Sequence, residues 1–246
     1  MRKLMFVAVL SILFGVGQAK ASPCASGTIA SYASTTCTID GLTFSNFTPG
    51  SLASSPGLAA FLSTNIVVTP VSNGNGVGFE LSPLAPADWT TVTSSQTLDL
   101  DWQFVVVCTN GTACIDDIFE QIAGTVSAAT PPLTLGGADT LTETYCLGSS
   151  TLPAGSCPSG DKSGEQILTV TPTNGTVSSN TTFSPVSTLA MNKDIEAQSF
   201  NTNTAALTSL TDEFSLVSTP EPSTILLLGT GLAGLAFFST RRRKAC

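Results

Sequence analysis

The sequence predicts an all-β fold, either a sandwich or a jelly roll, flanked by two terminal segments of different composition. Short apolar runs alternate with stretches rich in Thr, Ser, Gly, Asn and Pro, a texture typical of strands joined by turns. No long helical pattern interrupts it, and strands recur at short spacing. Of the 246 residues in the chain, residues 22–217 are therefore expected to form one β-domain.

The N-terminal segment, residues 1–21, has the form of a secretory signal peptide. Two cations precede an apolar run over residues 4–16, which is too short to span a bilayer comfortably. The cleavage site has the small-x-small form that signal peptidase accepts, and it is made by Ala19, Ala21 and Ser22. We expect cleavage after Ala21 and export of the β-domain.

The clearest strand is predicted over residues 97–109, where Leu98, Leu100 and Trp102 alternate with Asp99 and Asp101. This period of two places one face in the core and the other in water. Further strands are predicted at residues 42–47, 65–69, 77–81, 140–146, 166–171, 189–195 and 214–217. Residues 115–122 fit a helix or a strand, and the β context favours a strand. The sequence Asn-Gly-Asn-Gly at residues 73–76 predicts a hairpin.

The charge of the β-domain is more negative than that of the whole chain. Residues 22–220 contain two lysines, no arginine and 16 acidic residues, a formal charge of −14, whereas the chain as a whole has −8. Because phosphate binding requires clustered Lys and Arg, nucleic acid is excluded as a partner. A solvated acidic surface is the favoured interpretation, and cation binding is the alternative.

Cysteines of the exported region are even in number, which favours disulfides formed in an oxidising compartment. Their spacing groups them into the pairs Cys24–Cys37, Cys108–Cys114 and Cys146–Cys157. A metal site is the alternative use of these thiols. No Cys-x-x-Cys pair and no His is present, so neither a metal nor another cofactor is predicted.

No catalytic residues are predicted, and the protein is not expected to be an enzyme. The absence of His excludes Ser-His-Asp and Cys-His catalysis, and Lys162 and Lys193 are interpreted as surface charges. Asp99 and Asp101 share a strand face and could serve as acid and base or bind Ca²⁺, although a solvated strand face is the favoured interpretation. Trp89 could be an exposed platform for sugar rings, whereas Trp102 is expected in the core.

The C-terminal segment has three features in a fixed order. The sequence Pro220-Glu221-Pro222 leads into an uncharged apolar stretch at residues 223–240, which is long enough for a transmembrane helix. The basic tail, residues 241–246, then begins with the charges that would stop transfer, namely Arg241, Arg242, Arg243 and Lys244. By the positive-inside rule this tail stays in the cytoplasm and the β-domain lies outside.

Residues 218–246 resemble the PEP-CTERM sorting signal of diderm bacteria, a module that also occurs on proteins labelled ice-binding. The resemblance implies processing by an exosortase near Pro220, Glu221 and Pro222, with anchoring in the inner membrane beforehand and a cell-surface or extracellular location afterwards. Residues 24–47 are also similar to the opening of uncharacterised PEP-CTERM proteins. That second resemblance supports the architecture and implies no reaction.

The leading functional hypothesis is a surface or extracellular-matrix protein without a catalytic role, with exopolysaccharide as a candidate partner. The alternative is a carbohydrate-binding module on a β-sandwich, and the third choice is a secreted glycosidase-like enzyme. Glycan binding separates the first two, because a matrix protein that acts by being present needs no specific sugar ligand.

Overall fold

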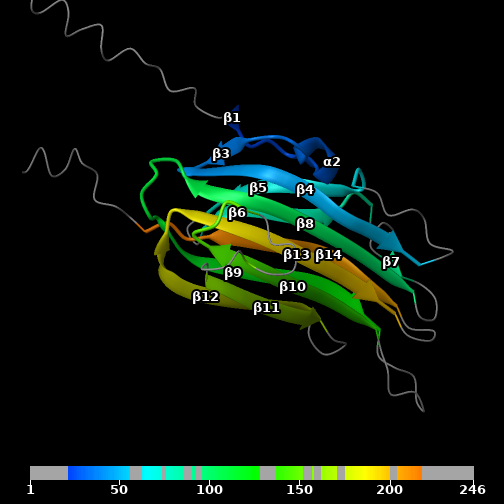
Figure 1. Cartoon of the computed structure of the whole chain (residues 1–246). Coiled ribbons are helices and arrows are strands. Elements are labelled where there is room, and N and C mark those ends of the chain that lie inside the picture. Colours follow the sequence, from blue (N-terminus) through cyan, green and yellow to red (C-terminus); the bar gives the residue numbers. More distant parts are fainter. Residues whose placement is uncertain are drawn as a thin grey trace, which may run out of the picture.

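The computed structural model describes residues 22–55, 63–73, 76–85, 90–91, 96–127, 137–151, 157, 162–170, 175–199 and 204–217. The regular secondary structure of these residues is almost entirely β-strand, which confirms the predicted class, and the strands form two seven-stranded sheets consistent with a β-sandwich (Figure 1). Within the described residues, no helix is long and apolar enough to cross a membrane.

The first sheet has the strand order β1-β3-β4-β8-β13-β10-β11. Its pairings are antiparallel except for the parallel pair β1–β3. Its strands are β1 (Ser22–Pro23), β3 (Cys37–Ile39), β4 (Leu42–Ser54), β8 (Thr97–Cys108), β10 (Ala138–Leu147), β11 (Lys162–Val170) and β13 (Thr188–Gln198).

The second sheet has the order β12-β9-β14-β6-β5-β2, with β7 paired to β14 beside this path. All of its pairings are antiparallel. Its strands are β2 (Gly27–Thr28), β5 (Ile66–Ser72), β6 (Val77–Pro83), β7 (Thr90–Thr91), β9 (Ile115–Val126), β12 (Thr176–Val186) and β14 (Ala205–Phe214). A single turn of helix, α2 (Ile29–Tyr32), follows β2.

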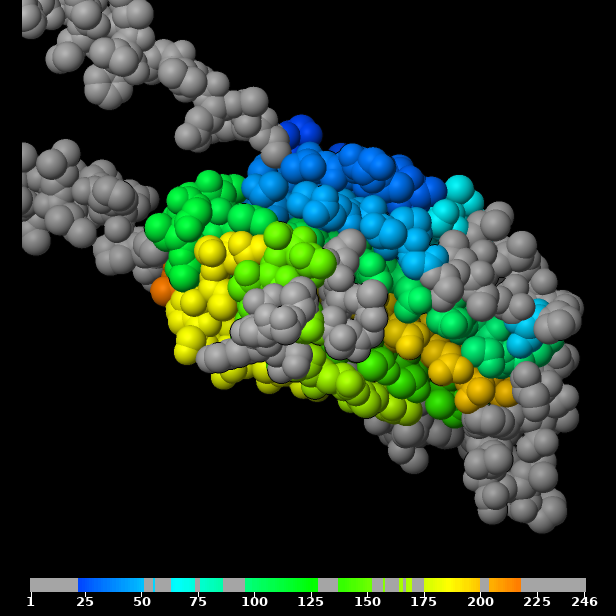
Figure 2. Space-filling model, in the orientation of Figure 1, coloured from blue at the N-terminus to red at the C-terminus, as the bar shows by residue number. Residues whose placement is uncertain are grey.

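The chain passes repeatedly between the two sheets after β8, because β9, β12 and β14 belong to the second sheet while β10, β11 and β13 belong to the first. Each central strand therefore pairs mainly with partners that are distant in sequence. In the space-filling view the blue N-terminal residues form one side of the body and the yellow residues of β12 lie toward the other (Figure 2). Every row of side chains between the sheets is consequently assembled from separate parts of the chain.

Alternating apolar residues from the two sheets fill the space between them. On β8 the even-numbered residues from Leu98 to Phe104 are buried, as the alternation predicted, and Trp102 is fully buried. Aromatic rings dominate this core, with Phe47 stacked on Trp102 at 5.7 Å between ring centroids and Phe44 edge-on to Phe79 at 4.7 Å. Each such pair contributes about 0.5–1.5 kcal/mol beyond the apolar area that it buries.

Hairpins form where the turn residues tolerate a positive φ. β5 and β6 pair with Ser72 opposite Val77, so residues 73–76 connect them as predicted. β3 and β4 pair with Ile39 opposite Leu42 through Asp40 and Gly41, whose φ angles are +40° and +95°. Asp-Gly is a common signal for this turn type.

Two of the longer strands, β12 and β14, differ most from the predictions, and the short strands β1, β2, β3 and β7 were not predicted either. A strand over residues 214–217 was predicted, but β14 ends at Phe214, and Leu216 makes an isolated bridge to Ile115. The register of β14 against β9 shifts between Leu207 and Ser209, and this irregularity breaks the alternation that the sequence would otherwise display. β12 was not predicted, because its Thr and Ser residues at the sheet edge bury little apolar surface.

Candidate functional site

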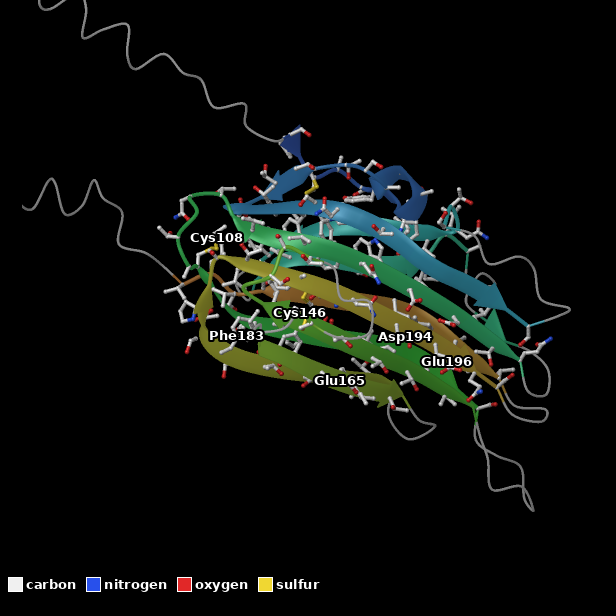
Figure 3. The ribbon with its side chains drawn as sticks, in the orientation of Figure 1. Cys108, Cys146, Glu165, Phe183, Asp194 and Glu196 are labelled. Atoms are coloured by element: carbon white, nitrogen blue, oxygen red, sulfur yellow. A yellow bond between two sulfur atoms is a disulfide. The ribbon has the colours of Figure 1, made fainter. Side chains whose placement is uncertain are left out.

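Four carboxylates form an acidic patch on the outer face of the first sheet, and they are Asp99, Asp101, Asp194 and Glu196. The register of β13 against β8 places Asp194 opposite Asp101 and Glu196 opposite Asp99. All four lie in the phase of their strands that points away from the core and are partly exposed. Asp194 and Glu196 follow one another along this face of β13 (Figure 3). The prediction that Asp99 and Asp101 share a wet face is therefore confirmed.

Burial and neighbouring like charges raise the pKa values of carboxyl groups in the acidic patch. Burial, followed by the charges of Asp194, Asp101 and Glu196, raises the pKa of Asp99 to about 6. Burial and then the charge of Asp101 raise the pKa of Asp194. A hydrogen bond between Asp99 and Asp194 favours the neutral form of Asp99 and the ionised form of Asp194.

Carboxylate oxygens of Asp99, Asp101 and Asp194 lie within 4.8 Å of one another. Oxygen ligands of this kind suit hard cations such as Ca²⁺. Exposed acidic groups are also common without an ion, so the arrangement does not by itself define a metal site. The geometry of the patch therefore gives no reason to prefer cation binding or acid–base catalysis. A solvated strand face, the interpretation that the sequence analysis favoured, accounts for it equally well.

A second group of charges lies between the two sheets, and we call it the charge cluster: Lys193, Glu143, Glu120 and Asp212. Lys193 forms ion pairs with Glu120 and Glu143, and its Nζ lies 3.2 Å from Oδ2 of Asp212. All four side chains are fully buried. The interpretation of Lys193 as a surface charge is therefore wrong, because its strand turns the ammonium group into the core.

Each sheet supplies two adjacent members of the charge cluster. In the first sheet Lys193 of β13 is opposite Glu143 of β10, and in the second Asp212 of β14 is opposite Glu120 of β9. The alternation of side chains along a strand explains why these charges are buried. Each charged residue stands at a position whose neighbours two residues away point into the core, as Leu141 and Tyr145 do on either side of Glu143. A charge in an apolar phase is thus the sequence signal that could have revealed the cluster.

Burial and the neighbouring charges both shift the pKa values of the charge cluster. Burial lowers the pKa of Lys193, but the charges of Asp212, Glu120 and Glu143 outweigh burial and raise it above its ordinary value. Burial raises the pKa of Asp212 to about 7 despite the opposing charge of Lys193. Burial, and next the charge of Glu120, raises the pKa of Glu143 well above its usual range. Oε2 of Glu120, Oε1 of Glu143 and Oδ1 of Asp212 are buried without a hydrogen-bond donor.

Asp139 is a further buried carboxyl group near the start of β10. Burial raises its pKa to about 7, and neither of its oxygens has a hydrogen-bond partner. A Cβ atom at Gly124 of β9 would clash with Asp139 Oδ2, so the missing side chain of this glycine leaves room for the carboxyl group. Buried Glu213 differs, because the side-chain amide of Asn73 donates a hydrogen bond of 2.5 Å to its Oε1.

Three disulfides join Cys24 to Cys37, Cys108 to Cys114 and Cys146 to Cys157, with Cα–Cα distances of 4.8, 6.1 and 5.5 Å. These are the pairs that the spacing favoured. The second bridge spans the passage from β8 to β9, where the chain crosses between the sheets. The third lies on the outer face of the first sheet, where Cys146 packs against Val105 and Ala190.

A shallow groove of about 450 Å³ lies beside the turn between β3 and β4, where the hydroxyl of Ser72 donates a hydrogen bond to Asp40. It is lined by Pro23, Cys24, Thr38, Ile39, Asp40, Pro70, Val71 and Ser72. None of these is aromatic, and every aromatic side chain among the described residues is buried or half-buried. The groove thus lacks the aromatic ring on which sugars commonly stack.

Several predicted site residues lie outside the described residues. They are Ala19 and Ala21 of the cleavage site, Trp89, the sorting residues Pro220, Glu221 and Pro222, and the stop-transfer charges Arg241, Arg242, Arg243 and Lys244. Ser22, the predicted first residue of the mature chain, begins β1. The structure therefore shows that the carboxylates of the acidic patch lie close together, whereas the interpretation of the tail rests on its sequence.

The described part of the molecule is an all-β, disulfide-containing domain whose carboxylates lie both on its surface and in its core. The C-terminal segment of the chain adds a second assignment, because residues 218–243 match the family described as the PEP-CTERM protein-sorting motif. The chain is thus a PEP-CTERM domain-containing protein. The motif implies export, surface sorting and exosortase as the processing partner.

No curated protein matches the chain. Among solved structures, TmCBM61 in complex with β-1,4-galactotriose has 6% sequence identity over 69% of this chain and 88% of that chain, with a TM-score of 0.31. A structure from a study of carbohydrate-binding modules of the β-sandwich superfamily has 8% identity over 80% of this chain and 63% of that chain, with a TM-score of 0.27.

Endoglucanase 3 of Trichoderma harzianum, from family GH12, has 12% identity over 69% of this chain and 97% of that chain, with a TM-score of 0.25. At such TM-scores the likeness supports no inference about ligand or reaction.

Proposed function

We propose that this protein is a non-catalytic surface or extracellular-matrix protein of a diderm bacterium, delivered by exosortase through its C-terminal signal. The observation that carries the proposal is the sorting motif at residues 218–243. Signal peptidase acts first in this scheme, removing residues 1–21, and exosortase then separates the β-domain of residues 22–217 from its tail. The mature domain functions by its presence at the surface or among exopolysaccharide.

The order of features in the tail supports this route. The apolar stretch at residues 223–240 stops transfer across the inner membrane, because the charges of residues 241–244 resist crossing. Each such charge at the bilayer centre costs about 2.5–3.5 kcal/mol on insertion scales. Proline disfavours the helical conformation in the residue before it, so we expect Pro220 and Pro222 to separate the apolar stretch from the domain. An extended segment at the outer face of the membrane is accessible to a processing enzyme.

Properties of the β-domain also support a non-catalytic role. The chain contains no His, and the cationic side chain that the structure describes, that of Lys193, is buried and paired with carboxylates. Three disulfides suit a domain that folds outside the cytoplasm. A formal charge of −14 over residues 22–220 keeps such a domain soluble among other polyanions.

Replacement of the tripeptide Pro220-Glu221-Pro222 by alanines tests the sorting route. The variant should be exported normally but remain in the inner membrane with its basic tail attached, and deletion of the exosortase should have the same effect on the unaltered protein. Mass spectrometry of the C-terminus in the native host measures this directly. The matched control replaces Ser218 and Thr219, which precede the tripeptide, and should be processed normally. Release of a tail-free domain from both the alanine variant and the deletion strain would refute the proposal.

A glycan array tests the statement that the mature domain acts without a specific ligand. The purified protein should give no specific signal on bacterial or plant polysaccharides. Saturable binding to one glycan class would favour the carbohydrate-binding alternative instead. Hydrolysis of a glycan in the same assay, abolished by Asp99→Asn or Asp101→Asn, would favour the glycosidase alternative.

A further inference from the structure

The charge cluster does not balance its own charge. Lys193 contributes one positive charge, whereas Glu120, Glu143 and Asp212 contribute three negative charges if all are ionised, which leaves two uncompensated negative charges in a fully buried site. An unpaired charge inside a protein costs several kcal/mol, so a buried carboxyl group without a partner takes up a proton instead. Each of the three carboxyl groups also has an oxygen without a hydrogen-bond donor.

Among the described residues, the positions beside the charge cluster on neighbouring strands supply no further cation. The register partners beside it are Trp102 of β8, Gln166 of β11, Ser179 of β12 and Phe79 of β6, all of them uncharged. The next charged group is Glu213, adjacent to Asp212 on β14, and its charge opposes ionisation of Asp212. Across residues 22–217 the cations are Lys162 and Lys193, with no Arg or His. The two missing positive charges must therefore come from solution.

The charge cluster lies between the two sheets, so its charge balance affects how the sheets pack together. Lys193 and Glu143 belong to the first sheet, and Glu120 and Asp212 belong to the second. Lys193 reaches across the interface to contact both carboxylates of the second sheet. Glu120 and Asp212 are moreover directly opposite one another on adjacent strands, an arrangement that destabilises a sheet when both are ionised.

We propose that the charge cluster is a pH-dependent link between the two sheets, which holds them together most strongly when two of its three carboxyl groups are protonated. In that state Lys193 and one carboxylate form a neutral ion pair, and the two protonated groups can donate hydrogen bonds to oxygens that otherwise lack a donor. Loss of the two protons leaves two negative charges between the sheets. Water then enters this row of the core, and the sheets are held together less strongly.

The direction of the pH dependence follows from the raised pKa values. In the folded protein the pKa of Asp212 is about 7 and that of Glu143 lies well above its usual range. In the unfolded chain both groups ionise near pH 4. The folded state thus binds more protons than the unfolded state, so the added stability is fully present below about pH 4 and is lost as the pH rises through about 7.

Thermal unfolding of the full-length protein in mild detergent tests the link. The midpoint should fall by about 5–15 °C between about pH 5 and pH 8. The variant Glu143→Gln/Asp212→Asn replaces two carboxyl groups by neutral groups of the same shape and keeps Lys193 paired with Glu120. Its midpoint should fall by at most about half as much as that of the unaltered protein over that range, because carboxyl groups with raised pKa values such as Asp139 remain, and it should be higher than that of the unaltered protein at about pH 8. The outer-face variant Asp99→Asn/Asp194→Asn is the matched control and should keep most of the decrease.

Infrared spectroscopy of the unaltered protein provides a second measurement that does not depend on the folding of any variant. The band of a protonated carboxyl group in an apolar environment should be present at about pH 5 and lost above the raised pKa values. Absence of this band, or a midpoint that does not change between the two pH values, would overturn the proposal. A double variant that folds and retains the full decrease would also overturn it, because other carboxyl groups such as Asp139 would then be responsible.

Divalent cations provide a further discriminating measurement at about pH 8. A single Ca²⁺ or Mn²⁺ could supply both missing charges, since the three carboxylates offer oxygens within 4.8 Å of one another. If either ion restores the acid-pH midpoint of the unaltered protein but not that of the double variant, a metal rather than protons balances the cluster, and the proposal is wrong. We expect no such restoration, because the ammonium group of Lys193 already lies among these oxygens.

Discussion

The acidic patch and the charge cluster use the same type of side chain on the two faces of one sheet. Asp194 and Lys193 are consecutive residues of β13, yet Asp194 lies on the wet outer face and Lys193 in the core. In the acidic patch, water and salt weaken the repulsion between carboxylates, so four of them can lie side by side. In the charge cluster neither is available, and three carboxylates require Lys193 and additional protons.

This difference indicates what each region contributes. The acidic patch carries surface charge, and its residues can be neutralised at little cost to the fold. The charge cluster connects two sheets through one ammonium group, so removal of Lys193 leaves three buried carboxyl groups without their common partner. We therefore expect the same charge-removing substitution to act strongly on one side of β13 and weakly on the other.

Removal of the central cation should have the largest effect on stability. Lys193→Met should lower the free energy of unfolding by about 3–5 kcal/mol near neutral pH, because three buried carboxyl groups lose their common partner. The loss should be smaller at about pH 5, where the carboxyl groups can take up protons. Urea unfolding at two pH values measures both quantities.

The control for this substitution is Gln198→Met on the outer phase of the same strand, which should change stability by no more than about 0.5 kcal/mol. An equal loss in the two variants would mean that β13 is sensitive to any change and that the ion pairs of Lys193 are unimportant.

The outer face of the first sheet carries a disulfide as well as the acidic patch, and breaking this disulfide should have an intermediate effect on stability. Cys146 packs with Val105 and Ala190 at one end of the face that carries the acidic patch. The variant Cys146→Ala/Cys157→Ala should lose about 2–3 kcal/mol, since the bridge closes a loop between cysteines 11 residues apart. Thermal or urea unfolding measures the loss.

The corresponding variant of Cys108 and Cys114 provides the comparison. These cysteines are 6 residues apart, so the chain-entropy model predicts a smaller loss. A larger loss at this bridge would show that its position between the two sheets matters more than the length of the loop that it closes.

Neutralising one member of the acidic patch should have the smallest effect, and in the opposite direction. Asp194→Asn removes a like charge opposite Asp101 and should stabilise the domain by about 0.2–1 kcal/mol near neutral pH. The gain should diminish as the pH falls, because burial and the charge of Asp101 raise the pKa of Asp194, so this carboxyl group takes up a proton more readily than an ordinary Asp. Urea unfolding at low ionic strength gives the best resolution. A loss of stability near neutral pH would instead indicate that the patch holds a cation.

Most strands could be predicted because their signal is local. The alternation of Leu98, Leu100 and Trp102 with Asp99 and Asp101 defines both a strand and its two faces, and the structure confirms them. β12 and β14 escaped prediction because β12 buries little apolar surface and β14 contains an irregularity that interrupts the alternation. A local pattern reveals a strand when the strand is regular and half-buried.

The sequence by itself determined the all-β class, the faces of the regular strands and the PEP-CTERM motif of the tail, because each depends on residues close together in the chain. Only the tertiary structure decided which strands are neighbours. The charge cluster unites residues 120, 143, 193 and 212, brought together by pairings between strands that are distant in sequence. Such pairings are selected by the packing of whole sheets, so a short stretch of sequence does not contain the information that places Lys193 among three carboxyl groups.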